Sequence, residues 1–215
     1  MGRILVLAGV NGAGKSSLLG MMLREDGANW FNPDSFTQAL VEAGWPLDEA
    51  NAAAWQEGVR RLRQAIADGT DHAFETTLGA KTIPRLLREA CDLHGVTVWF
   101  CGLESVELHI ERVAARVAAG GHDIAEDKIR GRYDSSRANL IALIPYLAAL
   151  RAYDNSRPPD AEGLVEPLLV LDMGREGIRY PETPEDLEQT PQWAKAIVMA
   201  ALDARPPDRV ERSLG

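Results

Sequence analysis

Two patterns of hydrophobic and polar positions alternate along the chain. Short apolar runs predict strands at Ile4–Ala8, His72–Glu75, Val96–Leu103 and Leu168–Asp172, with a weaker one at Asn29–Phe31. Longer segments, in which apolar residues recur at helical spacing, predict helices at Gly14–Arg24, Ser35–Ala43, Asp48–Asp68, Ile83–His94 and Val106–Ala119. This alternation of strands and helices predicts a mostly parallel sheet flanked by helices.

The alternation of predicted strands and helices changes after Ala119. Gly120 and Gly121 interrupt the helical pattern, and a long helical stretch is then predicted from about Ala125 to Arg151, with Pro145 kinking or dividing it. An arginine-bearing excursion of this kind, spanning about residues 120–151, is typical of a helical lid over a ligand. The alternative is a plain helix whose arginines face solvent. The tail from about 181 to 215 is rich in Pro, Glu and Asp, apart from a predicted docking helix at Gln192–Leu202.

Composition narrows the class of protein. The 215 residues, 46% hydrophobic and 26% charged, suit one α/β domain with its insertions. The formal net charge is -9 and no dense basic run occurs, so nucleic acid is not expected as a partner. No apolar stretch is long enough for a membrane span, and the first apolar run is too short for a signal peptide, so we expect a cytoplasmic protein. Cys91 and Cys101 are accordingly expected to be free thiols.

The first predicted strand runs directly into a phosphate-binding motif. Gly9-Val10-Asn11-Gly12-Ala13-Gly14-Lys15-Ser16 satisfies G-x-x-x-x-G-K-[ST]. Its glycines let backbone N–H groups close around a polyphosphate, and the following helix directs its positive end at the same group. Lys15 can reach the β- and γ-phosphates, and Ser16 can ligate Mg²⁺. The nucleotide-binding residues predicted here are Gly9, Asn11, Gly12, Ala13, Gly14, Lys15, Ser16 and Ser17.

Acidic residues follow two of the predicted strands. Asp34 comes shortly after the weak strand, and Glu75 ends the strand that begins at His72, just before Thr76 and Thr77. In a doubly wound sheet these strand ends face the same crevice as the phosphate loop. Asp34 could accept the proton of an attacking hydroxyl or hold Mg²⁺ through water, or it could simply cap a helix. Glu75 and the threonines could bind sugar hydroxyls or the waters of Mg²⁺, or serve only as turn residues.

The chain contains nineteen arginines but only four lysines. Arg112 and Arg116 are spaced to share a helix face, so both could point into one cleft. Together with Arg130 or Arg132 of the lid segment they could neutralise charge on a transferred phosphoryl group. The alternative is a set of exposed salt bridges with Glu107 and Glu111, which would stabilise little. We expect Arg116 and one arginine of the lid to function in catalysis.

The motif combination resembles the zeta-toxin-like P-loop kinase family. The resemblance covers about residues 3–157 and rests on Gly9–Ser16, Asn32-Pro33-Asp34, Phe74-Glu75-Thr76-Thr77-Leu78, Gly102-Leu103-Glu104-Ser105, Arg112, Arg116, Gly120-Gly121-His122-Asp123-Ile124, Arg130-Gly131-Arg132-Tyr133, Asn139-Leu140 and Tyr153-Asp154-Asn155-Ser156. It implies a kinase that uses ATP and Mg²⁺ to phosphorylate a hydroxyl of a sugar nucleotide such as UDP-N-acetylglucosamine, with an antitoxin protein as a partner. Plasmid-type toxins place a further arginine where this chain has Gly120-Gly121-His122, and Arg130 or Arg132 could substitute for it.

Carried onto this chain, the resemblance makes Asp34 the general base and Lys15 the phosphate-binding lysine. It places Glu75 and Thr77 at the sugar nucleotide, and it puts Arg112 and Arg116 on the arginine-bearing helix. We therefore predict a single P-loop kinase domain over residues 1–215. Asp34, Lys15, Arg116 and Arg132 are its catalytic residues, and Asp34, Glu75, Thr77 and Arg112 contact the substrate. Two alternatives stay open: a kinase of a nucleoside, dinucleotide or other metabolite, and a nucleotide-dependent binding module without a phosphoryl acceptor.

Overall fold

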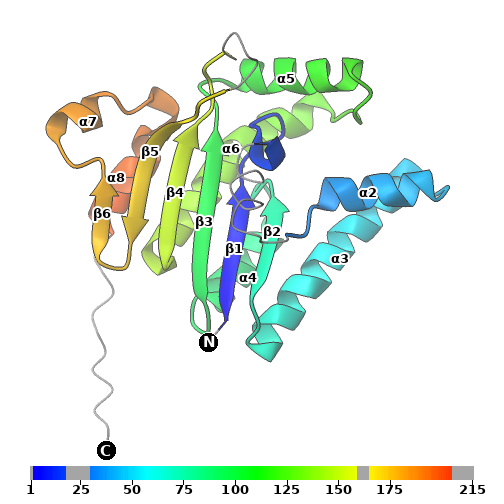
Figure 1. The fold of residues 1–215 in the computed structure, drawn as a ribbon, viewed down its shortest axis with the longest axis horizontal. Helices are drawn as coiled ribbons and strands as arrows, with labels where there is room; N and C mark the ends of the chain where they lie inside the picture. The colour runs from blue at the N-terminus through cyan, green and yellow to red at the C-terminus, as the bar shows by residue number, and fades with distance from the viewer. Residues whose placement is uncertain (1, 18–29, 159–164, 205–215) are drawn as a thin grey trace, which may run out of the picture.

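A six-stranded sheet forms the centre of the molecule (Figure 1). The computed structural model describes residues 2–17, 30–158 and 165–204. The strands are β1 (Arg3–Ala8), β2 (His72–Thr76), β3 (Gly95–Gly102), β4 (Ala149–Asp154), β5 (Leu168–Gly174) and β6 (Gly177–Tyr180), in the order β2-β1-β3-β4-β5-β6. The first four are parallel, whereas β5 and β6 are added antiparallel. The predicted fold class, a mostly parallel P-loop sheet flanked by helices, is confirmed.

The helices divide into a covering layer and a projecting hairpin. The helices are α2 (Pro33–Glu42), α3 (Leu47–Asp68), α4 (Thr82–Ala90), α5 (Val106–Ala118), α6 (Glu126–Leu143), α7 (Pro184–Glu188) and α8 (Lys195–Asp203). Helices α4, α6 and α8 lie behind the sheet in Figure 1, where they bury the main apolar cluster together with the central strands. Helices α2 and α3 form an antiparallel hairpin that extends beyond the β2 edge. The C-terminal ends of the parallel strands are therefore bordered by α2 on one side and α5 on the other.

The long helix predicted to reach Arg151 ends earlier. Helix α6 stops at Leu143, a short 3-10 turn, η1 (Ile144–Tyr146), contains Pro145, and Ala149–Asp154 then forms strand β4 between β3 and β5. Proline cannot donate the backbone hydrogen bond that would continue the helix. The six residues of β4 directly follow an apolar helical run and are too few to show a period of their own, so their pattern does not distinguish a strand from the end of a helix.

Other boundaries differ less. Helix α4 ends at Ala90 instead of His94, and the weak strand is reduced to a parallel bridge between Phe31 and Phe74, with Asn29 outside the described residues. Strand β6 was not predicted. The expected docking helix near the C-terminus is present as η2 (Gln192–Ala194) followed by α8, whose apolar face joins the main core. The helix after the phosphate loop is described over residues 15–17, and the rest of its predicted length lies outside the described residues.

Both cysteines carry free thiols. Cys101 is buried in β3, and Cys91 is partly buried at the end of α4. Burial raises the pKa of Cys101 to about 12 and that of Cys91 to about 11, which keeps both thiols protonated near neutral pH. Within the described part of the chain, none of the helices combines the length and the apolar character that crossing a membrane requires.

Candidate functional site

The phosphate-binding motif connects β1 to a helix that begins at Lys15. Gly9, Gly12 and Gly14 all have positive φ, at 140°, 83° and 90°. A Cβ on Gly9 would lie 2.1 Å from the backbone oxygen of Cys101, and one on Gly14 would lie 2.4 Å from Nδ2 of Asn155. Glycine is therefore required at both positions by backbone conformation and by close packing. The loop rests directly on the C-terminal ends of β3 and β4.

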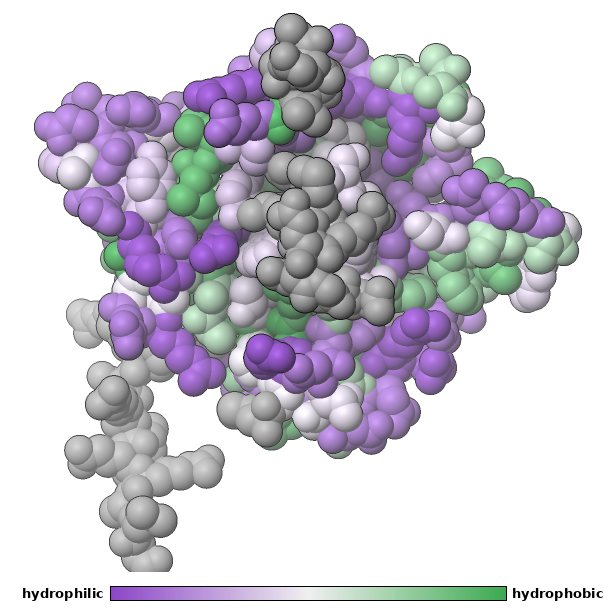
Figure 2. All heavy atoms as spheres, viewed as in Figure 1, coloured by the Kyte–Doolittle hydropathy of each residue, from purple (hydrophilic) through white to green (hydrophobic). Residues whose placement is uncertain are grey.

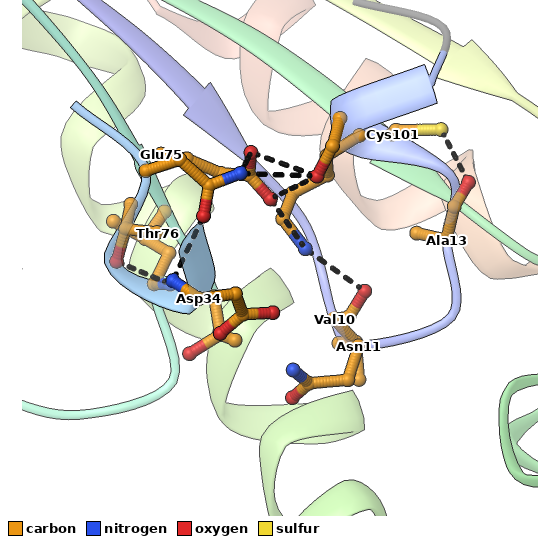
Figure 3. Close-up of polar contacts among 12 residues, drawn as sticks. Val10, Asn11, Ala13, Asp34, Glu75, Thr76 and Cys101 are labelled. Atoms are coloured by element: carbon orange, nitrogen blue, oxygen red, sulfur yellow. Dashed lines mark hydrogen bonds and ion pairs between the residues drawn. The ribbon is translucent and has the colours of Figure 1, made fainter. Parts of the chain in front are cut away.

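A buried charged cluster lies where β2 meets the phosphate loop. Glu75, 6% exposed, accepts a bifurcated hydrogen bond from the Ser16 hydroxyl, whose Oγ lies 2.9 and 3.0 Å from the two carboxylate oxygens. The ammonium of Lys15 lies 3.7 Å from Oε1 of Glu75 and donates to the Val10 carbonyl at 3.3 Å. Figure 3 shows these contacts converging on Glu75. The cluster holds Lys15 and Ser16 at the same end of the loop. In a phosphate loop this is where the lysine contacts the β- and γ-phosphates of a nucleotide and the serine binds a divalent cation.

Asn32 connects this cluster to helix α2. Its Nδ2 donates to Oε2 of Glu75 at 2.9 Å, while its Oδ1 accepts from the backbone N–H groups of Asp34 and Ser35 at 2.8 and 3.3 Å. Asn32 is thus the N-cap of α2, and Asp34 lies in the first helical turn. The possibility that Asp34 is the cap is therefore wrong. Because the Asp34 carboxylate does not cap the helix, it extends toward the same space as the Asn11 side chain (Figure 3).

Three cationic or ionisable side chains face Asp34 from the other side of the site. Arg116 of α5 places Nη1 3.8 Å from Oδ2 of Asp34, and His122 places Nε2 3.9 Å from Oδ1. Arg132 of α6 donates to Oδ1 of Asn11 at 2.7 Å. Burial lowers the pKa of Arg132, an effect that the negative charge of Asp34 opposes. Asp34 is 46% exposed at its side chain, so it is accessible to a ligand.

Two glycines let these arginines reach the site. A Cβ on Gly121 would lie 2.7 Å from Cγ of Arg116, and a Cβ on Gly79 would lie 2.7 Å from Cγ of Arg132. The main chain therefore passes directly over the aliphatic part of each arginine. A side chain at either glycine would therefore displace the arginine that packs against it.

Helix α6 is fastened to the loop that follows β2. Ser136 Oγ donates to the Thr77 carbonyl at 2.7 Å, Asn139 Nδ2 to the Leu78 carbonyl at 2.7 Å, and Ser135 Oγ to the Gly79 carbonyl at 2.8 Å. Leu78 is buried with a positive φ of 57°, a conformation that costs about 1 kcal/mol or more for a residue with a side chain. These three bonds hold the strained loop and fix the position of Arg132 relative to β2.

The site opens into a cleft of about 510 Å³ between the α2–α3 hairpin and the α5–α6 connection. Its lining includes Asn11, Lys15, Asp34, Glu75, Thr77, His122 and Arg132. Arg112, although it shares a helix face with Arg116, donates instead to the Arg157 carbonyl at 3.3 Å and is not among these residues. Arg130 forms exposed ion pairs with Glu107 and Glu126. Of the four arginines, only Arg132 lines the cleft, while Arg116 approaches Asp34 through its ion pair and Arg112 and Arg130 are engaged elsewhere. Ser17 is exposed in the first turn after the loop.

Several residues that hold the phosphate loop were missed from the sequence. His109 of α5, 1% exposed, donates from Nδ1 to the Asn11 carbonyl at 2.8 Å, and burial lowers its pKa to about 4, so the ring is neutral. Behind the loop, Asn155 Nδ2 and the Cys101 thiol both donate to the Ala13 carbonyl at 2.9 Å. Lone histidines and a loop asparagine carry no local signal of such contacts, because their partners are about 90 to 140 residues away in the chain.

No protein-family model matches this chain. An uncharacterized protein of Haemophilus influenzae is 28% identical over 141 residues, which cover 61% of this chain and 92% of the relative. Among solved structures, an AvrRxo1-ORF1:AvrRxo1-ORF2 complex with sulphate ions matches with a TM-score of 0.59 at 16% identity, over 89% of this chain. This chain spans 65% of the length of that protein.

A structure from the PezAT chromosomal toxin-antitoxin system of Streptococcus pneumoniae matches with a TM-score of 0.51 at 15% identity, over 93% of this chain and 86% of that one. At these identities the likenesses establish the fold.

Proposed function

We propose that this chain is an ATP-dependent phosphotransferase that transfers the γ-phosphoryl group of ATP to a hydroxyl of a small molecule. The observation that carries the proposal is that Lys15, Asp34 and Arg132 line one cleft, and that Arg116 places Nη1 3.8 Å from Oδ2 of Asp34. A phosphate loop alone would suit any nucleotide-binding protein. An accessible carboxylate opposite that loop, faced by cations, is what transfer to an alcohol requires.

The residues have separate roles in this proposal. Asp34 accepts the proton of the acceptor hydroxyl while that oxygen attacks the γ-phosphorus and ADP leaves. Lys15 contacts the β- and γ-phosphates, and Arg116 and Arg132 stabilise the charge that spreads over the transferred group. The Ser16 hydroxyl and the Glu75 carboxylate are hard oxygen donors side by side, which suits Mg²⁺. When bound there, Mg²⁺ supplies positive charge at the β- and γ-phosphate oxygens.

The acceptor proposed is a sugar nucleotide such as UDP-N-acetylglucosamine, with Thr77 and Glu75 near it. The resemblance to the zeta-toxin-like kinases supports this acceptor, as does a fold shared with a toxin-antitoxin protein. A structure of the AvrRxo1-ORF1:-ORF2 complex with ATP, at a TM-score of 0.55 and 16% identity, supports ATP as the nucleotide. One of these structures is a complex of AvrRxo1-ORF1 with AvrRxo1-ORF2, and another comes from a toxin-antitoxin system; we therefore also propose an antitoxin-like protein partner.

Asp34→Asn tests the base. We expect it to abolish phosphoryl transfer in a metabolite extract supplied with ATP and Mg²⁺, and to leave ATP affinity within about twofold, because the carboxylate contacts the acceptor and not the loop. Mass spectrometry of the extract identifies the product. Glu42→Gln is the matched control, since Glu42 ends the same helix and hydrogen-bonds only Gln38 at its exposed surface. Full turnover by Asp34→Asn would refute the assignment, and ATP loss without any phosphorylated product would favour a nucleotide-dependent binding module.

A further inference from the structure

One face of α3 lines the cleft that also contains Arg132. Leu47, Asn51 and Trp55 follow one another at intervals of four residues, and all three line the cleft. This spacing places them in a row on the helix surface. Asp34 and Lys15 line the same cleft from α2 and the phosphate loop, so the row on α3 is available to the part of the acceptor that does not react.

Trp55 is the most exposed large apolar residue of this wall, at 51%, and Leu47 beside it is 44% exposed. Figure 2 shows apolar and polar side chains mixed on the projecting α2–α3 hairpin that carries them. A ligand that covered this indole would gain much of the about 150–250 Å² that an aromatic side chain buries when it is packed. Small-molecule sites are lined by such groups with a few polar ones placed between them. Asn51 and Asp48, which also line the cleft, supply the polar groups beside Leu47 and Trp55.

The opposite wall carries a cation that the proposed chemistry does not use. Lys128, in the first turns of α6, lines the cleft and is exposed, and it forms no ion pair among the residues that the structure describes. Arg130, two residues along the same helix, is by contrast engaged by Glu107 and Glu126. An unpaired ammonium across from an aromatic platform suits a ligand that has a flat ring and a phosphate.

We propose that Trp55 and Leu47 form a stacking platform for the base of a nucleotide acceptor, and that Lys128 pairs with a phosphate of that acceptor. The proposal rests on the proposed function, since it assigns the non-reacting end of the acceptor in the same cleft. It makes Trp55 a specificity-determining residue, because a sugar phosphate that lacks a base cannot use the platform.

Tryptophan fluorescence of the full chain tests the platform directly. The ATP site is first filled with a non-hydrolysable ATP analogue and Mg²⁺, and the protein is then titrated with UMP, AMP or ribose 5-phosphate. The first two probes contain the third and add a base. We expect at least one base-bearing probe to quench the fluorescence and bind at least about tenfold more tightly than ribose 5-phosphate, as base stacking on an aromatic side chain predicts.

Trp55→Ala should weaken binding of that probe roughly tenfold or more, measured by calorimetry, and Lys128→Ala should weaken the nucleotide but not its nucleoside. Trp45→Ala is the matched control: Trp45 is 47% exposed on the same hairpin but does not line the cleft, so its replacement should leave affinity unchanged. Equal affinity of ribose 5-phosphate and the nucleotides, or wild-type affinity in Trp55→Ala, would overturn the proposal. So would the absence of binding by all three probes.

A kinetic measurement separates this proposal from the proposed function. With the acceptor found in the extract, Trp55→Ala should raise KM for the acceptor and leave kcat and KM for ATP within about twofold. If the extract yields no phosphorylated product, the kinase assignment fails while the binding titrations still decide the platform. If a product forms but lacks a base, the kinase assignment survives and the platform is refuted.

Discussion

The buried pair of Lys15 and Glu75 allows a test of what holds the phosphate loop against β2. Both side chains are 7% exposed, and the Nζ and Oε1 atoms are 3.7 Å apart. The perturbations are Glu75→Gln, Lys15→Met and the combination of the two. Each single change leaves the other charged group buried without its counter-charge, whereas the double change removes both charges together.

The magnitude follows from the geometry. At 3.7 Å, two unit charges attract by about 4 kcal/mol at an effective dielectric constant near 20, and desolvation of both groups offsets much of that energy. Breaking such a pair by removing one partner costs about 3–5 kcal/mol. We therefore expect each single variant to lose about 3 kcal/mol of unfolding free energy. The double variant should lose about 1–3 kcal/mol less than the sum of the singles.

Urea titrations of the four proteins, followed by circular dichroism, measure these free energies. Arg3→Met, Asp71→Asn and their combination provide a control cycle, because that pair is also ionic but has side chains 84% and 59% exposed. Its coupling should lie below about 1 kcal/mol. If the losses of the Lys15 and Glu75 variants simply add within about 0.5 kcal/mol, the two charges do not stabilise each other and the reasoning is refuted.

Three further predictions concern single residues. Burial lowers the pKa of His109 from 6.5 to about 4, so between these pH values the unfolded chain binds more protons than the folded chain. The free energy of unfolding should therefore fall by up to about 3 kcal/mol as the pH drops from 6.5 to 4. Urea titrations at a series of pH values should show a smaller pH dependence in His109→Leu. An unchanged pH slope in that variant would contradict the assignment. Gly9→Ala should abolish ATP binding in calorimetry while circular dichroism stays native, since its Cβ would lie 2.1 Å from the Cys101 oxygen; retained affinity would show that the loop can move aside. Arg116→Ala should lower kcat roughly a hundredfold, because Arg116 faces Asp34, whereas Arg112→Ala should lower it by less than about twofold. Equal losses of kcat in steady-state assays would show that both arginines act on the transferred group.

The local features of this protein could be predicted from its sequence. The phosphate loop was predictable because its glycines, lysine and serine act within eight consecutive residues, next to a strand of unmistakable apolar character. The fold class followed from short apolar runs that alternate with longer segments of helical spacing. Asp34 and Glu75 could be selected because they come just after strands, and parallel strands end at one edge of a sheet.

Only the tertiary structure shows which of these candidate residues has which role. Asn32 and Asp34 are two residues apart and both can cap a helix. In the structure Asn32 is the cap, because its Oδ1 accepts from the Asp34 N–H group while its Nδ2 is held by Glu75 of β2, 43 residues away. Likewise β4 could not be distinguished from the end of a helix, because its six residues follow an apolar helical run and are too few to show the period of a strand.

Sequence spacing correctly placed Arg112 and Arg116 on one face of α5, yet four residues of helix separate them by about 6 Å along its axis. Over that distance one reaches Asp34 and the other the Arg157 carbonyl. Residue patterns therefore determine which groups can meet a phosphate, because they act through local backbone geometry. Which groups do meet depends on packing between elements that are far apart in the chain, and no local pattern encodes it.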